Sequence, residues 1–424
     1  MRFEPVKIDL PQIVQGIIQT LTKAGYLTYL VGGCVRDHLL GRPCKDYDIV
    51  TSARPEQVIQ VFKNSIIVGK AYGVVKLIFP GSDLNLEIAT FRKDLNYKNY
   101  RHPEIEFSSP QEDALRRDFT INNLYYDLQQ KRVLDFTESL KDLRKKTLRA
   151  IGNPGQRFQE DALRLLRAIR FKTQLGFQIE TQTAQAIEKK AELILKISAQ
   201  RVREELTQIW QGPRPHEALL ELSKLQLLNQ LLPELDCLRQ KPEIWEWIFK
   251  SLENLARSFP ERSVVLSWST VLFALESLEK PVKPILERLQ ISRLNTGGIV
   301  KMIQDRFQFC HVFQMKKSSF QKWINQDDFG DLLKLYWVSE SHSAEKMKIY
   351  DYCFTQYQQR EKLRKQASEK LISGKDLIQL GFIPSPIFKK MLQQVEDLVF
   401  EESIGSKEEA LQYVLNHFKY LKKF

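Results

Sequence analysis

The hydrophobic pattern of the chain changes character near residue 140. Before that point, short apolar runs typical of strands alternate with segments whose apolar residues recur at helical spacing. The helical pattern covers 12–24, about 34–40 and 55–62, and the strand pattern covers 29–31, 48–50, 66–69, 74–79 and 84–91, with turn residues at 80–83. These runs predict a mixed sheet of about five strands with helices packed on one face.

After about residue 155 the strand pattern disappears and long amphipathic segments predominate. Residues 160–175, 181–195, 200–210 and 215–227 all have helical spacing, and proline and glycine separate many of the later segments. We therefore expect an α+β fold, in which an α/β head is followed by an all-helical body.

Length and charge add the expectation of several domains and a polyanionic partner. A chain of 424 residues is too long for one core, so two to four domains are expected. Lys and Arg number 64 against 52 Asp and Glu, a net charge of +12. Such an excess favours a polyanionic partner, although solubility alone would also explain it.

The N-terminus and the cysteines indicate a cytoplasmic protein. Glu4, Asp9 and two prolines fall where a signal peptide needs an unbroken apolar run. No stretch approaches the roughly 20 apolar residues of a membrane helix. The five cysteines are scattered without a C-x-x-C pair, so we expect free thiols and neither a disulfide framework nor a zinc site.

The segment LVGGCVRDHLLGRPCKDYDIVTSA, residues 30–53, has the chemistry of a phosphate-binding turn. The predicted strand ends at Gly32 and Gly33, and a helix starts at once. Glycines let backbone N–H groups approach a phosphate, and a helix N-terminus favours an anion. Arg36 lies in the first helical turn, where we expect it to reach the same anion.

Two carboxylates follow in the same segment and predict a metal site. Asp46 and Asp48 are two residues apart at a strand, so both point to one face. Oxygen ligands suit Mg²⁺, and a two-metal site would stabilise the attacking and leaving oxygens of nucleotidyl transfer. Glu87, on the predicted strand 84–91, could complete the site or help deprotonate the attacking hydroxyl. Alone, a D-x-D pair is usually a surface turn, and Glu87 could be a solvent-exposed acid at a strand edge.

Several segments, in order, resemble the class II tRNA nucleotidyltransferases (CCA-adding enzymes) and their relatives, the bacterial poly(A) polymerases. They are GGCVRD…LLG…KDYD (32–48), RRDFTINNLYYD (116–127), EDALRLLRAIRF (160–171) and SAQRVREEL (198–206), and 372–392 and 404–411 also resemble tail segments of the family. The resemblance implies a polymerase beta-like nucleotidyltransferase head (1–140), a helical neck (141–212), a helical body (213–330) and a helical RNA-binding tail (331–424).

The resemblance also implies an activity and roles for individual residues. It implies addition of C and A to the 3′ end of tRNA from CTP and ATP with Mg²⁺, by a protein, expected to be monomeric, that holds the acceptor and T-arm region. By this resemblance Asp46 and Asp48 bind metal; Gly32, Gly33 and Arg36 bind phosphate; Arg117, Asp118 and Asn122 hold the ribose and triphosphate; and Asp161, Arg164 and Arg167 contact the base and phosphates.

The neck motif suggests how C and A are chosen without a template. Asp161 and Arg164 are three apart in a predicted helix and so should share a face. Cytosine and adenine both present an amino donor beside a ring-nitrogen acceptor, whereas uracil and guanine present the opposite order. A carboxylate and a guanidinium would therefore accept C or A and reject U or G. On its own, the stripe of Arg164, Arg167 and Arg170 would more often be a solvated helix face.

Two segments bear on specificity. Residues 89–107 are polar and poor in regular pattern, and the family has a flexible loop here that takes part in the switch from C to A addition. The family segment D-P-x-x-G-x-x-D-L occurs here as residues 135–143 without its proline and glycine, so its bending could differ. An enzyme that adds only the terminal A, a poly(A) polymerase, and an RNA-binding protein without activity remain alternatives.

Overall fold

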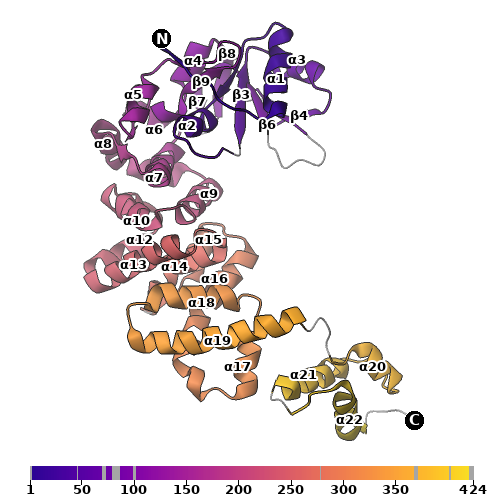
Figure 1. Cartoon of the computed structure of the whole chain (residues 1–424). Helices are drawn as coiled ribbons and strands as arrows, with labels where there is room; N and C mark the ends of the chain where they lie inside the picture. Colours follow the sequence, from indigo (N-terminus) through magenta and orange to yellow (C-terminus); the bar gives the residue numbers. More distant parts are fainter. Residues whose placement is uncertain are drawn as a thin grey trace. The chain divides into compact units, whose positions relative to one another are not determined.

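The computed structural model describes residues 2–419 apart from 45, 69–72, 79–85, 99–101, 277, 367–370 and 401–402. It divides into two compact units, which are described separately: Met1–Pro242 with Ile285–Ile291, and Glu243–Pro284 with Ser292–Phe424. The first unit contains a mixed sheet followed by helices, and the second is helical (Figure 1). The expected α+β class is therefore confirmed.

The central sheet of the first unit has eight strands among the described residues, in the order β1-β10-β9-β2-β3-β6-β5-β4. Strands β3 and β6 are parallel, and all other neighbours are antiparallel. The strands are β1 (Arg2–Pro5), β2 (Thr28–Val31), β3 (Tyr47–Thr51), β4 (Ser65–Ile67), β5 (Val74–Leu77), β6 (Leu86–Thr90), β9 (Leu124–Asp127) and β10 (Arg132–Asp135). Strands β1, β9 and β10 come in addition to the five expected; β9 and β10 are buried almost throughout, so their polar and apolar residues do not alternate.

Packing on this sheet fixes the strands that carry the candidate site. One face buries Val31, Val50 and Tyr125 with Phe91 and Ala114. Helix α1 packs against β2 and β3. The helices of this part are α1 (Gln12–Lys23), α2 (Gly33–Leu39), α3 (Pro55–Val61) and α4 (Pro110–Leu115).

Residues 89–107 differ from the irregular loop that was expected. Strands β7 (Arg92–Lys98) and β8 (His102–Phe107) form a separate antiparallel pair with a register shift between Asp94 and Tyr97. Charged side chains on both strands hide the two-residue alternation from a hydrophobicity pattern. The tip at 99–101, like the turn predicted at 80–83, lies outside the described residues.

The rest of the first unit is mainly helical, and α7 packs against α9 and α10. The short strands β11 and β12 form a parallel pair. The expectation that strands end before about residue 155 was therefore wrong for β12. The elements are α5 (Ser139–Arg144), β11 (Thr147–Leu148), α6 (Pro154–Glu160), α7 (Leu163–Leu175), β12 (Gln178–Ile179), α8 (Thr181–Lys189), α9 (Ala199–Trp210), α10 (Pro215–Lys224), α11 (Leu227–Leu231) and α12 (Pro233–Asp236).

The second unit packs around α14, which is buried from Leu266 to Leu275 and contacts α16 and α18. The last three helices share a hydrophobic core of their own, which includes Leu377, Met391 and Val414. The helices are α13 (Pro242–Ser258), α14 (Val264–Glu276), α16 (Arg293–Asp305), α17 (Lys317–Ile324), α18 (Phe329–Glu340), α19 (Ala344–Gln366), α20 (Gly374–Gln379), α21 (Ile387–Phe400) and α22 (Lys407–Phe418), whereas α15 (Lys283–Arg288) falls mostly in the first unit. Among the described helices, none has the length and apolar character needed to span a bilayer.

Candidate active site

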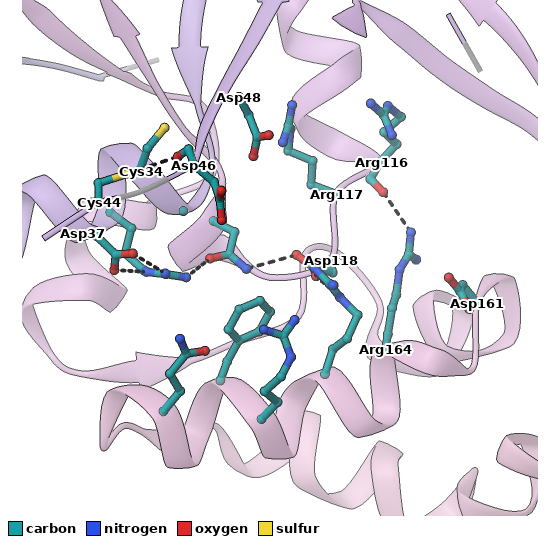
Figure 2. A pocket seen from close by; sticks show the side chains of 18 of the residues that line it. Cys34, Asp37, Cys44, Asp46, Asp48, Arg116, Arg117, Asp118, Asp161 and Arg164 are labelled. Atoms are coloured by element: carbon teal, nitrogen blue, oxygen red, sulfur yellow. Dashed lines mark hydrogen bonds and ion pairs between the residues drawn. The ribbon is translucent and has the colours of Figure 1, made fainter. Parts of the chain in front are cut away.

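A pocket of about 590 Å³ in the first unit gathers most of the predicted site residues (Figure 2). Asp48 lies in β3, and Asp46 immediately precedes that strand. Asp48 is paired with Val31 of β2 on one side and with Glu87 of β6 on the other, so the three acidic residues meet at one end of the sheet. Asp46 and Asp48 line the pocket, whereas Glu87 flanks Asp48 without lining it.

Burial and the charged side chains around Asp48 shift the pKa of its carboxyl group. Burial raises the pKa of Asp48, and the carboxylates of Glu87 and Asp46 raise it further, whereas Arg117 and Arg167 oppose this increase. Mutual repulsion among carboxylates is the environment that a bound cation relieves. The donor set is therefore chemically suited to a hard divalent ion.

Gly32 is required where β2 turns into α2. Its φ is +85°, and a Cβ there would lie 3.3 Å from Oδ2 of Asp48. A side chain at this position would therefore strain the backbone and crowd the carboxylate. Gly33 begins α2 and also lines the pocket.

A chain of hydrogen bonds joins four of the predicted residues. Arg36 donates from Nη1 to Oδ1 of Asn122 (2.5 Å), Asn122 donates from Nδ2 to Oδ1 of Asp118 (3.4 Å), and Arg167 donates from Nε to Oδ2 of Asp118 (2.8 Å). The chain runs from α2 across to α7, so it holds the head side of the pocket against the neck side.

Arg36 is less open to a ligand than its place in the first helical turn suggested. Its residue is 4% exposed, and its Nε and Nη2 both donate to the carboxylate of Asp37. With Nη1 bound to Asn122, three of the five N–H donors of the guanidinium are engaged. In this structure Arg36 fixes Asn122, and its role at a phosphate stays a prediction.

Arg117 is held from behind by a buried acid. It donates from Nη2 to Asp113 (3.0 Å) and from Nε to the hydroxyl of Tyr125 (3.0 Å), and Tyr125 itself donates to Asp113 (2.8 Å). Burial would raise the pKa of Asp113, but Arg117 and Arg116 lower it to about 2. The acid is therefore charged at neutral pH and keeps the Arg117 guanidinium at the pocket wall.

Asp161 and Arg164 both line the pocket but do not share a helix face as expected. Helix α6 ends before Asp161, which is extended (φ −144°, ψ 104°), and α7 starts at Leu163. Asp161 accepts from the N–H of Leu163 (3.0 Å) and thereby caps the new helix. The carboxylate of Asp161 thus lines the pocket because the helix is broken there, and a pattern that assumes one continuous helix could not predict this.

Arg164 is fixed by acceptors on both sides of the pocket wall. Its Nη1 donates to the carbonyl of Arg157 and to Glu160, and its Nη2 donates to the carbonyl of Arg116, each within 3.0 Å. The contact with Arg116 joins α7 of the neck to the end of α4 in the head. The guanidinium of Arg164 is therefore held in a fixed position at the pocket wall, beside Asp161.

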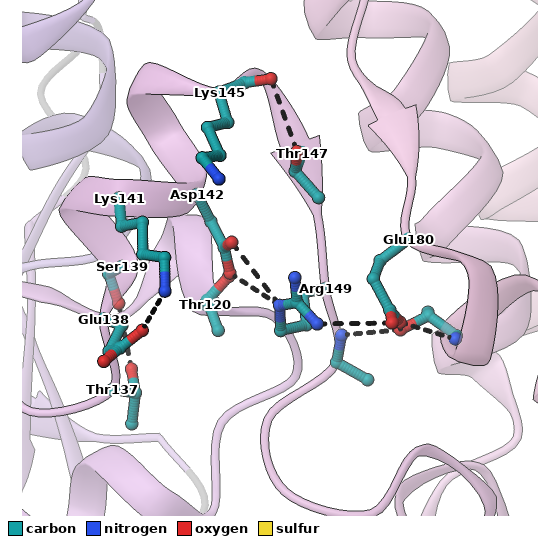
Figure 3. Close-up of polar contacts among 12 residues, drawn as sticks. Thr120, Thr137, Glu138, Ser139, Lys141, Asp142, Lys145, Thr147, Arg149 and Glu180 are labelled. Atoms are coloured by element: carbon teal, nitrogen blue, oxygen red, sulfur yellow. Dashed lines mark hydrogen bonds and ion pairs between the residues drawn. The ribbon is translucent and has the colours of Figure 1, made fainter.

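The connection between head and neck is fixed by a second set of contacts (Figure 3). Asp142 accepts from the hydroxyl of Thr120 (2.8 Å) and from Nε of Arg149 (3.1 Å). Arg149 also pairs with Glu180 at the start of α8 (3.2 Å). Asp142 and Arg149 together therefore link Thr120 of the head to α5 and α8.

Sequence reasoning missed other lining residues. Cys34 and Cys44 are free thiols at the pocket, and the ring of Phe171 lies beneath the guanidinium groups of Arg36, Arg167 and Arg170, at 5.5, 5.1 and 4.4 Å. Phe171 is the last residue of the motif EDALRLLRAIRF, so this motif could have indicated that Phe171 lies at the site. The further lining residues are Asp37, Pro43, Arg116, Arg170 and Gln174.

Across the described residues, no group of three or more His, Cys, Asp or Glu side chains is arranged to hold a metal ion. A pair of carboxylates nevertheless suits Mg²⁺, which keeps water ligands and takes further oxygens from substrate phosphates. Asp46 and Asp48 therefore fit such an ion, with Glu87 beside them.

Two family models match the chain. The model described as the poly A polymerase head domain matches residues 28–149, and the model described as a probable RNA and SrmB-binding site of polymerase A matches residues 176–238. The first match covers the sheet strands β2 to β10 and the acidic pair. The second covers α8 to α12.

Curated relatives match over nearly the whole chain. The CCA-adding enzyme of Pediococcus pentosaceus is 31% identical over 95% of this chain and 96% of its own length. The CCA-adding enzyme of Lactobacillus helveticus is 30% identical over 97% of this chain and 99% of its own length.

Solved structures agree with these relatives. The Bacillus stearothermophilus CCA-adding enzyme in complex with CTP aligns with a TM-score of 0.72 and 27% identity, over 96% of this chain and 98% of that one. The Thermotoga maritima CCA-adding enzyme complexed with tRNA aligns with a TM-score of 0.63 at 20% identity, over 99% and 100% of the two chains, which supports the fold alone.

Proposed function

The chain belongs to the family of CCA-adding enzymes, and we propose that it adds C and A nucleotides to the 3′ end of tRNA, taking them from CTP and ATP. The observation that carries the proposal is one pocket lined both by the carboxylates of Asp46 and Asp48 and by the pair Asp161 and Arg164. The first pair suits phosphoryl transfer, and the second suits recognition of a base edge. We propose the cytoplasm as the compartment, in keeping with five free cysteines.

The proposed reaction is an in-line displacement at the α-phosphorus. The 3′-hydroxyl oxygen of the tRNA forms the new phosphodiester bond, the bond to the β-phosphate bridge breaks, and pyrophosphate leaves. Asp46 and Asp48 would hold divalent metal, for which we propose Mg²⁺; when bound, the metal supplies charge stabilisation at the attacking and leaving oxygens. Glu87, next to Asp48, would accept the proton of the hydroxyl or complete the metal site.

The triphosphate is proposed to lie between the glycine turn and the arginines. Gly32 and Gly33 leave the backbone open beside Asp48, so a phosphate can approach N–H groups there. Arg117 and Arg167 supply positive charge, held by the carboxylates of Asp113 and Asp118 respectively. Asp118 and Asn122, linked to each other and to Arg36, are proposed to face the ribose hydroxyls.

Base choice is assigned to Asp161 and Arg164. The carboxylate accepts from the amino group of cytosine or adenine, and the guanidinium donates to the adjacent ring nitrogen. Uracil and guanine present a carbonyl and an N–H at these positions, so their binding would leave buried polar groups unpaired. The extensive bonding of Arg164 supports this assignment because it keeps the guanidinium from following a wrong base.

A stepwise addition assay tests the proposal. The protein is incubated with Mg²⁺, one labelled nucleotide at a time, and tRNAs that end before CCA, after C, and after CC. We expect C on the first two tRNAs and a single A on the third. A alone on the third tRNA, with no C on the others, would establish an A-adding enzyme; continued A addition would establish a poly(A) polymerase; and no addition would exclude the enzymatic role.

A further inference from the structure

Two of the five cysteines lie together beside the acidic pair. Cys34 is in the first turn of α2, and Cys44 is in the turn that leads to β3. Strands β2 and β3 are antiparallel, with Val31 opposite Asp48, so the residues after β2 lie next to those before β3. The side chains of the two cysteines contact each other in the pocket wall (Figure 2). A bond between them would close a loop that ends just before the acidic pair.

Each thiol also contacts the backbone that carries the site. Sγ of Cys34 donates to the carbonyl of Val31 (3.1 Å), and Sγ of Cys44 donates to the carbonyl of Asp46 (3.1 Å). Both cysteines line the pocket, so a small oxidant that enters it can reach them. Cys34 is buried, whereas Cys44 is partly exposed. Because exposed thiols react faster than buried ones, Cys44 is placed to meet the oxidant first, with Cys34 next to it.

We propose that Cys34 and Cys44 form a redox-sensitive pair, which a peroxide converts to a disulfide and a dithiol restores, and that the disulfide slows nucleotide addition. The cytoplasm keeps thiols reduced, and disulfides of cytosolic proteins are usually transient and redox-sensing. The reduced pair is therefore the resting state. The formation of the disulfide stands on the geometry of the two thiols, whereas its effect on addition rests on the proposed function.

The oxidation needs one peroxide for each pair of thiols. The sulfur of Cys44 attacks one oxygen of hydrogen peroxide, the O–O bond breaks, and the thiol becomes a sulfenic acid as water leaves. The sulfur of Cys34 then attacks the sulfur of Cys44, the S–O bond breaks, and the hydroxyl group leaves as water with the proton of Cys34. Two thiols are oxidised to one disulfide, and one peroxide is reduced to two waters.

The disulfide acts on Asp46 through the backbone. The two sulfurs must close to about 2.0 Å, which is shorter than any non-bonded contact. Cys44 lies in the turn just before Asp46, so drawing its sulfur towards α2 also moves the backbone of Asp46. The disulfide removes the S–H that Cys44 donates to the carbonyl of Asp46. A displacement of about 1 Å at a reacting centre can lower the rate about a hundredfold, and Asp46 is one of the two proposed metal ligands.

The test uses the full chain with Cys237→Ser and Cys310→Ser, which removes the two exposed thiols and keeps the pair. This parent protein is treated with hydrogen peroxide, alkylated and digested without reductant, and its peptides are identified by mass spectrometry. We expect a cross-link between Cys34 and Cys44 that dithiothreitol removes. The rate of C addition to a tRNA that lacks CCA should fall about a hundredfold on oxidation and return with dithiothreitol.

Cys34→Ser and Cys44→Ser in this parent are the matched controls, each compared with its own rate before oxidation. Cys44→Ser should form no cross-link and keep its rate in peroxide. Dimedone, which traps sulfenic acids, should label Cys44 in Cys34→Ser but not Cys34 in Cys44→Ser. The absence of the cross-link in the parent, or a cross-linked parent that adds C at its reduced rate, would overturn the proposal. If the reduced wild type adds no nucleotide, the proposed function fails instead, and the cross-link still reports on the thiol pair.

Discussion

Gly32 shows how one residue controls the geometry of the acidic pair. Its backbone has a φ of +85°, and any Cβ would lie 3.3 Å from Asp48. We expect Gly32→Ala to destabilise the protein by about 1–3 kcal/mol and to lower nucleotide addition by about a hundredfold. Thermal unfolding and initial rates measure the two effects.

The matched control is Gly16→Ala in α1, where a Cβ would meet nothing within 4 Å. Alanine is the better helix former, so this change should stabilise the protein by up to about 1 kcal/mol and leave the rate unchanged. Equal behaviour of the two variants would contradict the role given to Gly32.

Asp113 gives the protein a pH dependence that can be assigned to one residue. Its folded-state pKa of about 2 lies below the unfolded value of about 3.9. The stabilisation is therefore complete above the unfolded value and is lost as the pH falls from about 4 towards 2; it amounts to about 2 kcal/mol. Denaturant unfolding at pH 3, 4, 5 and 7 should show a steeper acid loss for wild type than for Asp113→Asn. Parallel curves would contradict this origin.

Local sequence order was enough to predict some of the site, and the reason is physical. Asp46 and Asp48 are two residues apart at the start of β3, so their relation follows from strand geometry. Arg36 and Asn122 are 86 residues apart and meet through tertiary packing, which periodicity does not encode. For the same reason Arg201 was seen in a motif but not as a partner of Asp161.

At the scale of elements, the hydrophobic pattern misplaced one helix boundary and missed several strands. Helix α7 was expected, but its start was placed too early, because Glu160 to Leu165 continue the helical pattern through the break at Asp161. Strands β9 and β10 were missed because buried strands of four residues have little alternation. The hairpin of β7 and β8 was taken for a loop because its composition is polar.

The start of α5 provides a test at this scale. The family segment has a glycine at the position of Ser139, but here the positive φ (57°) falls on Glu138. Ser139 is buried, and its hydroxyl contacts that of Thr137 (2.9 Å) and the carbonyl of Asn123 (3.5 Å). Restoring the family glycine with Ser139→Gly should therefore destabilise the protein by about 1–2 kcal/mol.

Glu138→Gly is the neighbouring control, because glycine is favoured at a positive φ. Its effect on the free energy of unfolding should be smaller than that of Ser139→Gly. The reverse order in denaturant unfolding would show that the segment is built as in the family pattern after all.

At the scale of the whole molecule, the α+β class and the order of head and helices were predictable from where the strand pattern stops. The division into head, neck, body and tail stays a prediction, as does the monomeric state. The net charge of +12 is consistent with a tRNA partner, since each phosphate contact adds to the affinity. Nucleotide addition at the pocket of the first unit, together with tRNA binding, would produce a tRNA with a defined 3′ end.

The most direct measurement is the sequence of that product end. Wild type and Asp48→Asn are each given Mg²⁺, all four nucleoside triphosphates and a tRNA that lacks CCA, and the 3′ ends are sequenced. We expect wild type to extend the tRNA to CCA and then stop. The variant should still bind tRNA, but its rate of nucleotide addition should be about a thousandfold lower than that of wild type. Ends with U or G, a run of A, or equal extension by the variant would contradict the account.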